Sequence, residues 1–450
     1  MTIFISCFFN LVARNVLHTK FFEYLKKTKG YRIILLVPKI NADAFKKEFS
    51  NTNIIIESVH FLPMSKINLL FHWLSWNLLN TKSKKIHKIV QFGKDSNRLM
   101  YMFTSFLGWL GGYKIIRKIF RKLDYWLVPR GMFDYLFNKY KPDMVLATDI
   151  QDLRVQELCD TSLVREAKRR GIYSMGMGRS WDSMTTKGLL RTLPHQLIVQ
   201  STSIKDQAIK YHSVDSKQVF VTGTLHYDKY ILGKHMPRED FFKNLGLDES
   251  KKLILLTIPS DIWTGDASLS RYLLNTFSQL NEQVIVRFPL FGKVDVGDFK
   301  LPLKMVFDNP YNSDRLEESK LSIDDDDHLA DLIYYSDVVV TGPSSIILDA
   351  SIFNKPVVLI GFDGDKSRPY WKSMSRYYDY EHQQSAILLG KMKVAKDKDQ
   401  LVNLVLEYLS NPDLNKEGRR AVAENICFKL DGQAGLRLTQ LIWNTLTLKK

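Results

Sequence analysis

The stretch DVVVTGPSSIILDASIFNKPVVLI, residues 337–360, contains a complete strand–turn–helix–strand unit. Val338–Thr341 and Pro356–Ile360 are short apolar runs rich in β-branched residues, which is typical of strands buried in a parallel sheet. The segment between them, Ser345–Phe353, has the length of a helix and follows a turn that contains Gly and Pro. This stretch therefore predicts a βαβ unit, the building block of doubly wound α/β domains.

The same alternation of strands and helices runs through most of the 450 residues. It predicts an α/β fold with two Rossmann-like doubly wound domains, residues 1–228 and 229–430, which enclose a cleft. A C-terminal helix in residues 431–450 could cross back to the first domain. The predicted strands are Ile3–Phe9, Arg32–Pro38, Ile54–Ser58, Met144–Ala147, Ile172–Met175 and Gln196–Gln200, then Leu253–Thr257, Val284–Phe288, Met305–Phe307, Val338–Thr341 and Pro356–Ile360.

The N-terminal residues up to Ala13 are apolar, but they lack a basic start and are interrupted by Arg14. They are too few to span a bilayer, which takes about 20 apolar residues. We therefore interpret Ile3–Phe9 as a buried strand rather than a signal segment. The three cysteines show no disulfide or zinc spacing, which favours a reducing, cytoplasmic setting.

Lysine and arginine outnumber aspartate and glutamate by 64 to 48, which gives a formal charge of +16. Such a surplus attracts anions: phosphorylated substrates, anionic lipid or nucleic acid. Because no recognisable RNA- or DNA-binding motif is present, we expect no nucleic-acid partner. Binding of nucleic acid or membrane without catalysis is the alternative from a different functional class.

Residues 67–141 form a predicted helical insertion that is rich in aromatic and basic residues. Between Tyr113 and Lys141 there are eight basic and two acidic residues. A basic amphipathic helix here could lie in the interface of an anionic membrane, on the inner face of the cell membrane. It could also be an ordinary helix that covers the sheet and has a solvated basic face. Its apolar residues at helical spacing are Ile115, Ile116, Ile119, Phe120 and Leu123.

The turn after the first strand of the quoted stretch carries the strongest chemical signal. Two serine hydroxyls stand there beside the free amides of a helix start, and such amides bind phosphate. A carboxylate one turn into the helix could reach the hydroxyls of a ribose. The alternative is a serine cap without a ligand. The residues expected to bind a nucleotide donor here are Thr341, Gly342, Ser344, Ser345 and Asp349.

The run from His328 to Ile360 resembles the donor-binding segment of GT-B-type glycosyltransferases, and it is similar to that of UDP-GlcNAc 2-epimerases and CDP-glycerol glycerophosphotransferases. The resemblance covers most of residues 195–445. It implies that Ser344 and Ser345 contact phosphate and that Asp349 contacts ribose or sugar. Many relatives have a glutamate in place of this aspartate and more glycines in the turn.

Arg287-Phe288-Pro289, at the end of a predicted strand, resembles an Arg-x-Pro segment of the same relatives. Ligands gather at the carboxyl ends of parallel strands, so Arg287 could bind phosphate through a two-pronged contact, with Pro289 in the same donor site. A surface arginine without a ligand is the alternative. The segment Leu430–Arg437 resembles the Asp-Gly-x-Ala-x-x-Arg close of polymerases that use CDP-alcohols.

The loop from Gly178 to Gly188 follows another predicted strand. It resembles the Ser-Trp-Asp-Asn-x-Thr-x-Lys-Gly loop of surface-polysaccharide transferases, with Ser183 in place of the Asn. A carboxylate must accept the proton of the acceptor hydroxyl in an inverting transfer, and we predict Asp182 first and Asp149 second for this role. The residues expected to bind the acceptor substrate are Arg179, Ser180, Trp181, Thr185 and Lys187.

Three further groups are weaker candidates. His226 lies in a segment that resembles the Gly-Asn-x-x-Asp segment of relatives and could act on phosphate or on a proton. Asn10 and Arg14 begin the first helix, where relatives bind acceptor or pyrophosphate, although polar residues at a helix start need no ligand. The acidic run Asp324–Asp327 lacks the spacing of a Ca²⁺ loop, and we interpret it as a solvated turn in which Asp327 caps the next helix.

These features together predict a glycosyltransferase. It would transfer a sugar from a nucleotide-sugar to a glycan- or polyprenyl-linked acceptor in the synthesis of a surface polysaccharide such as O-antigen or capsule, with no cofactor and no required metal. One alternative is phosphoglycerol or phosphoribitol transfer from a CDP-alcohol, with His195 and His226 as candidate acid and base. Another is a sugar-nucleotide 2-epimerase.

Overall fold

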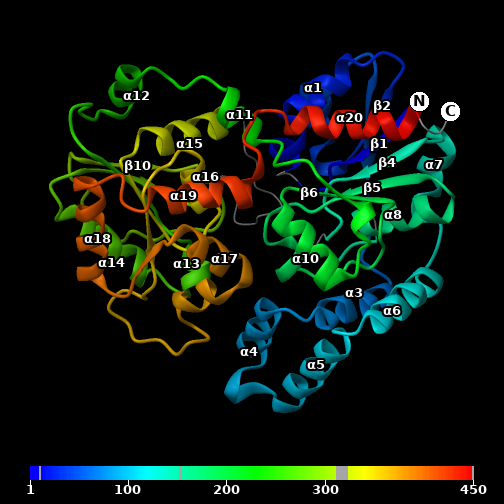
Figure 1. Cartoon of the computed structure of the whole chain (residues 1–450), viewed down its shortest axis with the longest axis horizontal. Coiled ribbons are helices and arrows are strands. Elements are labelled where there is room, and N and C mark those ends of the chain that lie inside the picture. Colours follow the sequence, from blue (N-terminus) through cyan, green and yellow to red (C-terminus); the bar gives the residue numbers. More distant parts are fainter. Residues whose placement is uncertain (10–11, 152–154, 158, 311–322, 448–450) are drawn as a thin grey trace. The chain divides into compact units, whose positions relative to one another are not determined.

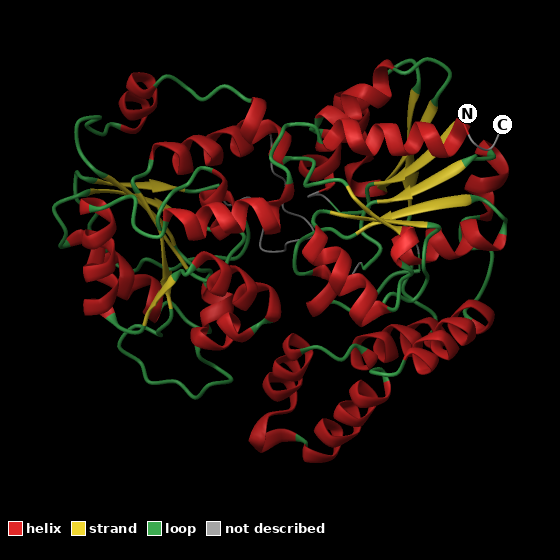
Figure 2. Cartoon of the chain, in the orientation of Figure 1, coloured by secondary structure: helices red, strands yellow, loops and turns green. Residues whose placement is uncertain are grey.

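The chain forms two compact units. Unit 1 consists of residues 1–229 and 431–450, and unit 2 of residues 230–430. Figures 1 and 2 show one sheet in each unit, with helices on both of its faces. The predicted α/β fold with two Rossmann-like domains is confirmed. The computed structural model describes residues 1–9, 12–151, 155–157, 159–310 and 323–447.

Unit 1 is built on a seven-stranded parallel sheet in the order β3-β2-β1-β4-β5-β6-β7. The order reverses between β1 and β4, which is where α/β sheets bind ligands. All six strands predicted for this part of the chain are present, and the short edge strand β7 is an addition. The strands are β1 (Thr2–Ser6), β2 (Arg32–Pro38), β3 (Ile54–Val59), β4 (Met144–Ala147), β5 (Tyr173–Met177), β6 (Gln196–Val199) and β7 (Val219–Val221).

The central strand β1 shows why the apolar N-terminus folds as it does. Its residues Ile3, Phe4 and Ile5 have no exposed surface, because β1 pairs with β2 on one side and β4 on the other. Strands covered in this way are continuous apolar runs. The prediction of a buried strand is confirmed, although the strand ends at Ser6 rather than Phe9.

Helices connect the strands of unit 1, and four of them (α3–α6) form the predicted insertion between β3 and β4. Figure 1 shows α3 beside α6, with α4 and α5 farther from the sheet. The helical segments are η1 (Ala13–Leu17, a π-helix), α1 (Lys20–Lys27), η2 (Lys39–Asn41), α2 (Ala42–Phe49), α3 (Lys66–Leu78), α4 (Lys82–Ser96), α5 (Arg98–Leu110), α6 (Lys114–Leu127), α7 (Asp134–Tyr140), α8 (Asp160–Arg169), α9 (Ser183–Thr186), α10 (Thr202–His212) and η3 (Ser216–Gln218).

The last helix, α20 (Ala434–Thr447), belongs to unit 1 and packs on α1. The Asp228 carboxylate accepts hydrogen bonds from the amides of Ala434 (2.9 Å) and Gly435 (2.8 Å) and so caps this helix. A Cβ added to Gly435 would lie 2.6 Å from the Phe21 nitrogen, so the close approach of the two helices requires glycine here. Asp228 is thus a structural residue.

Unit 2 repeats the design with a six-stranded parallel sheet in the order β10-β9-β8-β11-β12-β13. The order reverses between β8 and β11. All five predicted strands are present, and the edge strand β13 is an addition of three residues. The strands are β8 (Leu253–Thr257), β9 (Gln283–Arg287), β10 (Met305–Asp308), β11 (Val338–Thr341), β12 (Val357–Ile360) and β13 (Lys393–Ala395).

The helices of unit 2 include the predicted strand connections and a helical C-terminal part. The interpretation of Asp324–Asp327 as a turn before the helix is wrong, because these residues form the first turn of α15, where carboxylates interact favourably with the helix dipole. The segments are α11 (Tyr227–Leu232, at the boundary with unit 1), α12 (Arg238–Leu245), α13 (Asp261–Thr264), α14 (Ser268–Ser278), α15 (Ile323–Tyr335), α16 (Ile346–Ile352), η4 (Met374–Asp379), α17 (Glu381–Gly390), α18 (Lys398–Ser410), α19 (Lys416–Val422) and η5 (Ala423–Phe428).

Candidate active site

The serine turn lies at the point where the strand order of unit 2 reverses. Thr257 ends β8 and Thr341 ends β11, and their hydroxyls form a hydrogen bond of 2.6 Å. The turn leaves the sheet directly after this pair. A crevice at the carboxyl ends of the strands is expected at such a switch point.

The turn itself offers polar groups next to α16. The Ser344 hydroxyl accepts a hydrogen bond from the Ile346 amide at 3.3 Å. Ser345 is exposed, and its side chain makes no capping hydrogen bond. A Cβ added to Gly342 would meet Met374 at 3.8 Å, an ordinary contact, so packing within unit 2 does not demand glycine there.

A cluster that the sequence did not predict lies at the end of β9 and β10. The Arg287 guanidinium pairs with the Asp308 carboxylate, which also accepts a hydrogen bond of 3.2 Å from Nε2 of His328 on α15. Burial tends to raise the pKa of Asp308, but the hydrogen bond from His328 and the charge of Arg287 outweigh it and lower this pKa. Asp308 is therefore a carboxylate that orients both the guanidinium of Arg287 and the imidazole of His328.

Strand register places these groups in one row along the carboxyl edge of the sheet. Asp308 is paired with Arg287, Arg287 with Thr257, and Thr257 with Thr341. Neighbouring strands are about 4.8 Å apart, so Arg287 and Thr341, two strands apart, are separated by about 10 Å. A diphosphate and its sugar have this scale. Pro289 follows Arg287 by two residues and is partly exposed.

Asp349 is more enclosed than the sequence predicted, with 7% of its surface exposed. Its carboxylate lies close to Cys427 of η5. Burial raises the pKa of the Cys427 thiol, and the negative charge of Asp349 raises this pKa further. Only a small part of the Asp349 side chain is therefore accessible to a ribose.

The switch point of unit 1 is built on a similar polar pair. The Thr148 amide donates to the Ser6 hydroxyl (3.0 Å), and the Thr148 hydroxyl donates to the Ser6 carbonyl (2.7 Å). The next residue, Asp149, pairs with Arg179 at 3.1 Å, and the Arg179 guanidinium lies 4.0 Å from the centre of the Phe9 ring. Because Asp149 is only 1% exposed, this arrangement holds the arginine in place and leaves the carboxylate little access to an acceptor.

The loop from Gly178 to Gly188 is held at both of its ends. The Gln200 amide donates to the Gly178 carbonyl (2.6 Å), and the Gln151 amide donates to the Gly188 carbonyl (2.9 Å). Between them, Asp182 begins the short helix α9. These contacts present the loop at the carboxyl edge of β5.

Asp182 organises the middle of this loop. Its carboxylate accepts hydrogen bonds from the hydroxyls of Ser180 and Thr186, the latter at 2.7 Å, and lies 4.0 Å from Nζ of Lys187. A quarter of the Asp182 side chain is exposed (25%), against 1% for the Asp149 side chain. Of the two predicted carboxylates, Asp182 is therefore the more accessible to an acceptor.

Two other residues of the loop serve its packing. The Trp181 side chain is partly buried against a hydrophobic cluster that includes Ile150 and Val199, and part of its surface stays exposed. Thr185 is fully buried, its hydroxyl donates to the Asp182 carbonyl (3.2 Å), and it supports the loop from below.

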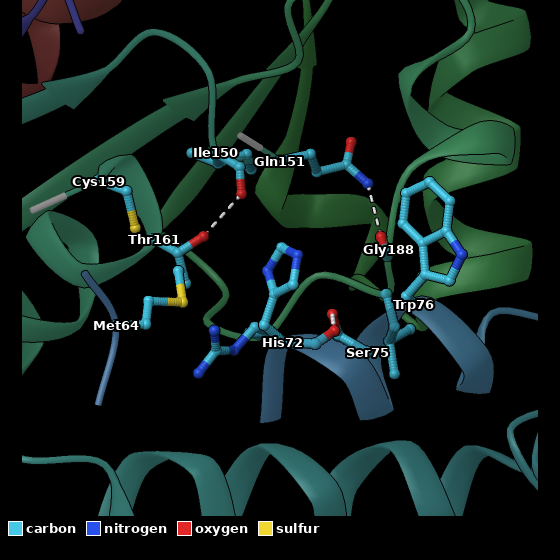
Figure 3. Close-up of a pocket in the computed structure, with 11 residues that line it drawn as sticks. Met64, His72, Ser75, Trp76, Ile150, Gln151, Cys159, Thr161 and Gly188 are labelled. Atoms are coloured by element: carbon cyan, nitrogen blue, oxygen red, sulfur yellow. Dashed lines mark hydrogen bonds between the residues drawn. The ribbon is translucent and has the colours of Figure 1, made fainter. Parts of the chain in front are cut away.

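A small cavity lies between α3 and the end of the loop at Gly188 (Figure 3). Gln151 and Gly188 border it, and Thr161 donates to the Ile150 carbonyl at its other side. Its volume of about 20 Å³ holds roughly one water molecule and no sugar. The cavity is therefore not a substrate site.

The two histidines predicted as acid and base, His226 and His195, are poorly placed for this chemistry. Burial lowers the pKa of His226 well below its usual value, and the charges of Arg14 and Lys229 lower it further, so this ring is neutral. His195 precedes β6 and therefore lies at the amino ends of the strands, opposite the loop. This position does not support the predicted role of His195 as acid or base. Asn10 lies outside the described residues, and Arg14 donates to the Asn15 side chain at 2.9 Å.

The chain's Asp-Gly-x-Ala-x-x-Arg segment is structural. Arg437 pairs with Asp431 at 2.8 and 2.9 Å and donates to the Thr222 carbonyl at 2.7 Å. It thus anchors the start of α20 next to the end of β7. In the part of the chain that the structure describes, no group of three acidic, histidine or cysteine side chains is arranged to hold a metal ion.

Comparison with protein families connects this architecture to a known group. Residues 175–444 match the family described as CDP-Glycerol:Poly(glycerophosphate) glycerophosphotransferase, and the match spans more than half of the chain. The chain belongs to this family. The matched range includes the Asp182 loop, all of unit 2 and most of α20, so the protein is a transferase whose family features lie in both units. No curated protein sequence matches it.

Solved structures show the same fold at low sequence identity. The UDP-GlcNAc 2-epimerase of Neisseria meningitidis bound to UDP-GlcNAc is 12% identical, with a TM-score of 0.55 over 99% of this chain and 100% of that one. The S. aureus MnaA–UDP complex is 14% identical, with a TM-score of 0.53 over 99% and 97%. The glycotransferase of kitacinnamycin is 13% identical, with a TM-score of 0.52 over 98% of each chain. The chain therefore has the GT-B-type fold.

Proposed function

We propose that this transferase moves a sugar from a nucleotide-sugar to a hydroxyl of a glycan- or polyprenyl-linked acceptor during the synthesis of a surface polysaccharide, such as O-antigen or capsule. The main support is the row of polar groups at the switch point of unit 2, in a chain of a transferase family. Two proteins of the same fold have UDP-GlcNAc or UDP in their structures, which supports a nucleotide-sugar as donor.

In this proposal unit 2 binds the donor. The exposed Ser345 hydroxyl and the amides of the turn bind one phosphate, and Arg287 binds the other. Gly342 lets the phosphate approach the backbone because it has no side chain, although packing within unit 2 would tolerate one. Asp349 contacts the ribose through its small exposed part. These groups stabilise the negative charge of the departing nucleotide, and no metal is required.

Unit 1 binds the acceptor in this proposal, with Arg179, Ser180, Trp181 and Lys187 of the loop around it. The acceptor oxygen forms a bond to the anomeric carbon, and the bond from that carbon to the phosphate oxygen breaks. Its electron pair leaves with the nucleotide. Asp182 takes the proton of the acceptor hydroxyl, since it is the more exposed of the two candidate carboxylates.

A second candidate is transfer of glycerol phosphate or ribitol phosphate from a CDP-alcohol. The family match favours it, and so does the pairing of His328 with Asp308 beside Arg287, which provides an oriented imidazole for acid–base chemistry. Here the acceptor oxygen would attack the phosphorus next to the alcohol, the phosphoanhydride bond would break, and CMP would leave. The product would then retain a phosphate.

Release of free nucleotide from UDP-, GDP-, CMP- and CDP-activated donors, with and without glycan acceptors, tests both candidates. Glycosyl transfer predicts acceptor-dependent nucleotide release and a product without new phosphate. The second candidate predicts CMP release from a CDP-alcohol, phosphate in the product and loss of activity in His328→Ala. Interconversion of a UDP-N-acetylhexosamine without acceptor, or no turnover of any donor, would contradict both.

A further inference from the structure

Helix α6 carries apolar side chains on two sides: Ile116 and Phe120 pack inward, and a second apolar stripe faces outward. Ile115, Ile119 and Leu123 follow one another at four-residue spacing and are 60%, 48% and 48% exposed. The same stripe continues at the end of the helix with Trp126 and Leu127, which are 59% and 54% exposed. A helix of a water-soluble domain normally buries such a stripe.

Charged side chains fix α6 in this orientation from the inside. The fully buried Asp124 pairs with Arg165 of α8 at 2.8 Å and with Arg191 at 2.7 Å. Two turns earlier, Arg117 is buried and donates to the carbonyls of Gly111 (2.6 Å) and Lys210 (2.8 Å). Turning the helix to bury its apolar stripe would break these contacts and leave buried charges uncompensated. The outward apolar stripe is therefore a stable feature of unit 1.

The preceding helix α5 is arranged in the same way. Its inward side carries Thr104 and Gly108, which face the buried Lys88 of α4, and the Lys88 ammonium donates to the Thr104 carbonyl. A Cβ added to Gly108 would lie 2.8 Å from the Lys88 nitrogen, so a larger residue would displace the Lys88 ammonium from its present position. Its outward side carries Leu99, Met102, Phe103, Phe106 and Trp109, all at least half exposed.

Basic residues accompany these apolar stripes. Lys114, Lys118 and Lys122 are exposed and form a second stripe on α6 beside the apolar one. Aromatic side chains with adjacent lysines match the interface of a membrane with negatively charged lipids. A symmetric pairing of two copies of this surface would bring the same basic patches together, which opposes self-association.

We propose that α5 and α6 dock the protein on the surface of an anionic bilayer, with their apolar stripes in the interface. Across the residues that the structure describes, no helix has the length and apolarity needed to cross a membrane. The 14 residues of α6 extend only about 21 Å, less than the roughly 30 Å hydrocarbon core. The helices thus lie along the membrane plane.

Flotation of the full chain with vesicles tests this inference independently of any donor or acceptor. We expect binding to vesicles of phosphatidylcholine with 30% phosphatidylglycerol, about 10-fold weaker binding without the anionic lipid, and weaker binding at high salt. Ile115→Ser/Ile119→Ser/Leu123→Ser should reduce partitioning at least about 10-fold. Lys114→Gln/Lys118→Gln/Lys122→Gln should reduce it by up to about 100-fold.

Two matched variants control for total hydrophobicity and charge. Ile40→Ser/Leu303→Ser/Leu388→Ser removes three side chains that are 87%, 101% and 77% exposed elsewhere, and Lys46→Gln/Lys47→Gln/Lys243→Gln removes three exposed lysines elsewhere. Both should bind vesicles like the wild type. The inference is overturned if the wild-type chain does not float, or if the α6 serine variant floats equally well. A wild-type dimer that the serine variant dissociates, without vesicle binding, would instead identify a contact between copies.

Discussion

Replacement of Asp124 by asparagine tests the buried ion cluster that orients α6. One carboxylate, 0% exposed, balances two guanidiniums that are 1% and 5% exposed, at 2.8 and 2.7 Å. Removing it leaves two buried positive charges without a counter-charge, and breaking one such buried pair costs about 3–5 kcal/mol. For a domain the size of unit 1, each kcal/mol lowers the melting temperature by about 2–4 °C, so we expect a decrease of about 10 °C.

Differential scanning calorimetry of the full chain measures this change, because it resolves the transition that contains unit 1. The matched control is Asp43→Asn, which removes a 99%-exposed carboxylate paired with Lys46 and should leave the melting temperature unchanged. A decrease of less than about 3 °C for Asp124→Asn would show that water or a shift of α6 compensates the arginines. The argument that buried charges keep the outer apolar stripe of α6 facing outward would then fail.

Three further predictions concern the proposed site and the pH range. Arg287→Ala should lower turnover by about 100-fold or more, and Arg287→Lys should not restore it, since a lysine cannot make the paired contacts of a guanidinium. The matched control for steady-state kinetics is Arg271→Ala, which removes an arginine on the same unit that is 48% exposed. An equal loss of activity in both alanine variants would contradict the assignment of Arg287. Donor turnover should persist in excess EDTA, and activity that returns only with added Mg²⁺ or Mn²⁺ would refute the metal-free proposal. Burial lowers the pKa of His212 to about 3, whereas a histidine in the unfolded chain has a pKa of about 6.5. Below pH 6.5 the unfolded chain therefore binds a proton at His212 that the folded chain does not, and the free energy of unfolding should fall by about 2 kcal/mol from pH 7 to pH 5. Thermal melts should show a smaller fall for His212→Gln, and an identical fall would assign the acid sensitivity to other groups.

The fold class and the position of the serine turn follow from the sequence alone. Continuous runs of β-branched residues separated by helix-length segments specify parallel strands, and parallel strands bring all their following loops to one edge. The placement of Arg287 and Thr341 on the same row follows from this rule. The edge strands β7 and β13 were not predicted, because each has only three residues, too few to show a periodic pattern of apolar side chains.

Which side of each element faces inward, and which distant charges meet, depends on the tertiary structure. Helical spacing showed that α6 is amphipathic, but only the pairing with Arg165 and Arg191, far along the chain, explains why Asp124 is buried. An apolar stripe on the same helix meanwhile faces outward. The pairing of Asp308 with His328 likewise joins a strand end to a separate helix. Local periodicity records the preference of a residue for burial. It does not indicate which oppositely charged residue will compensate a buried charge, because that residue comes close only when distant segments of the chain fold together.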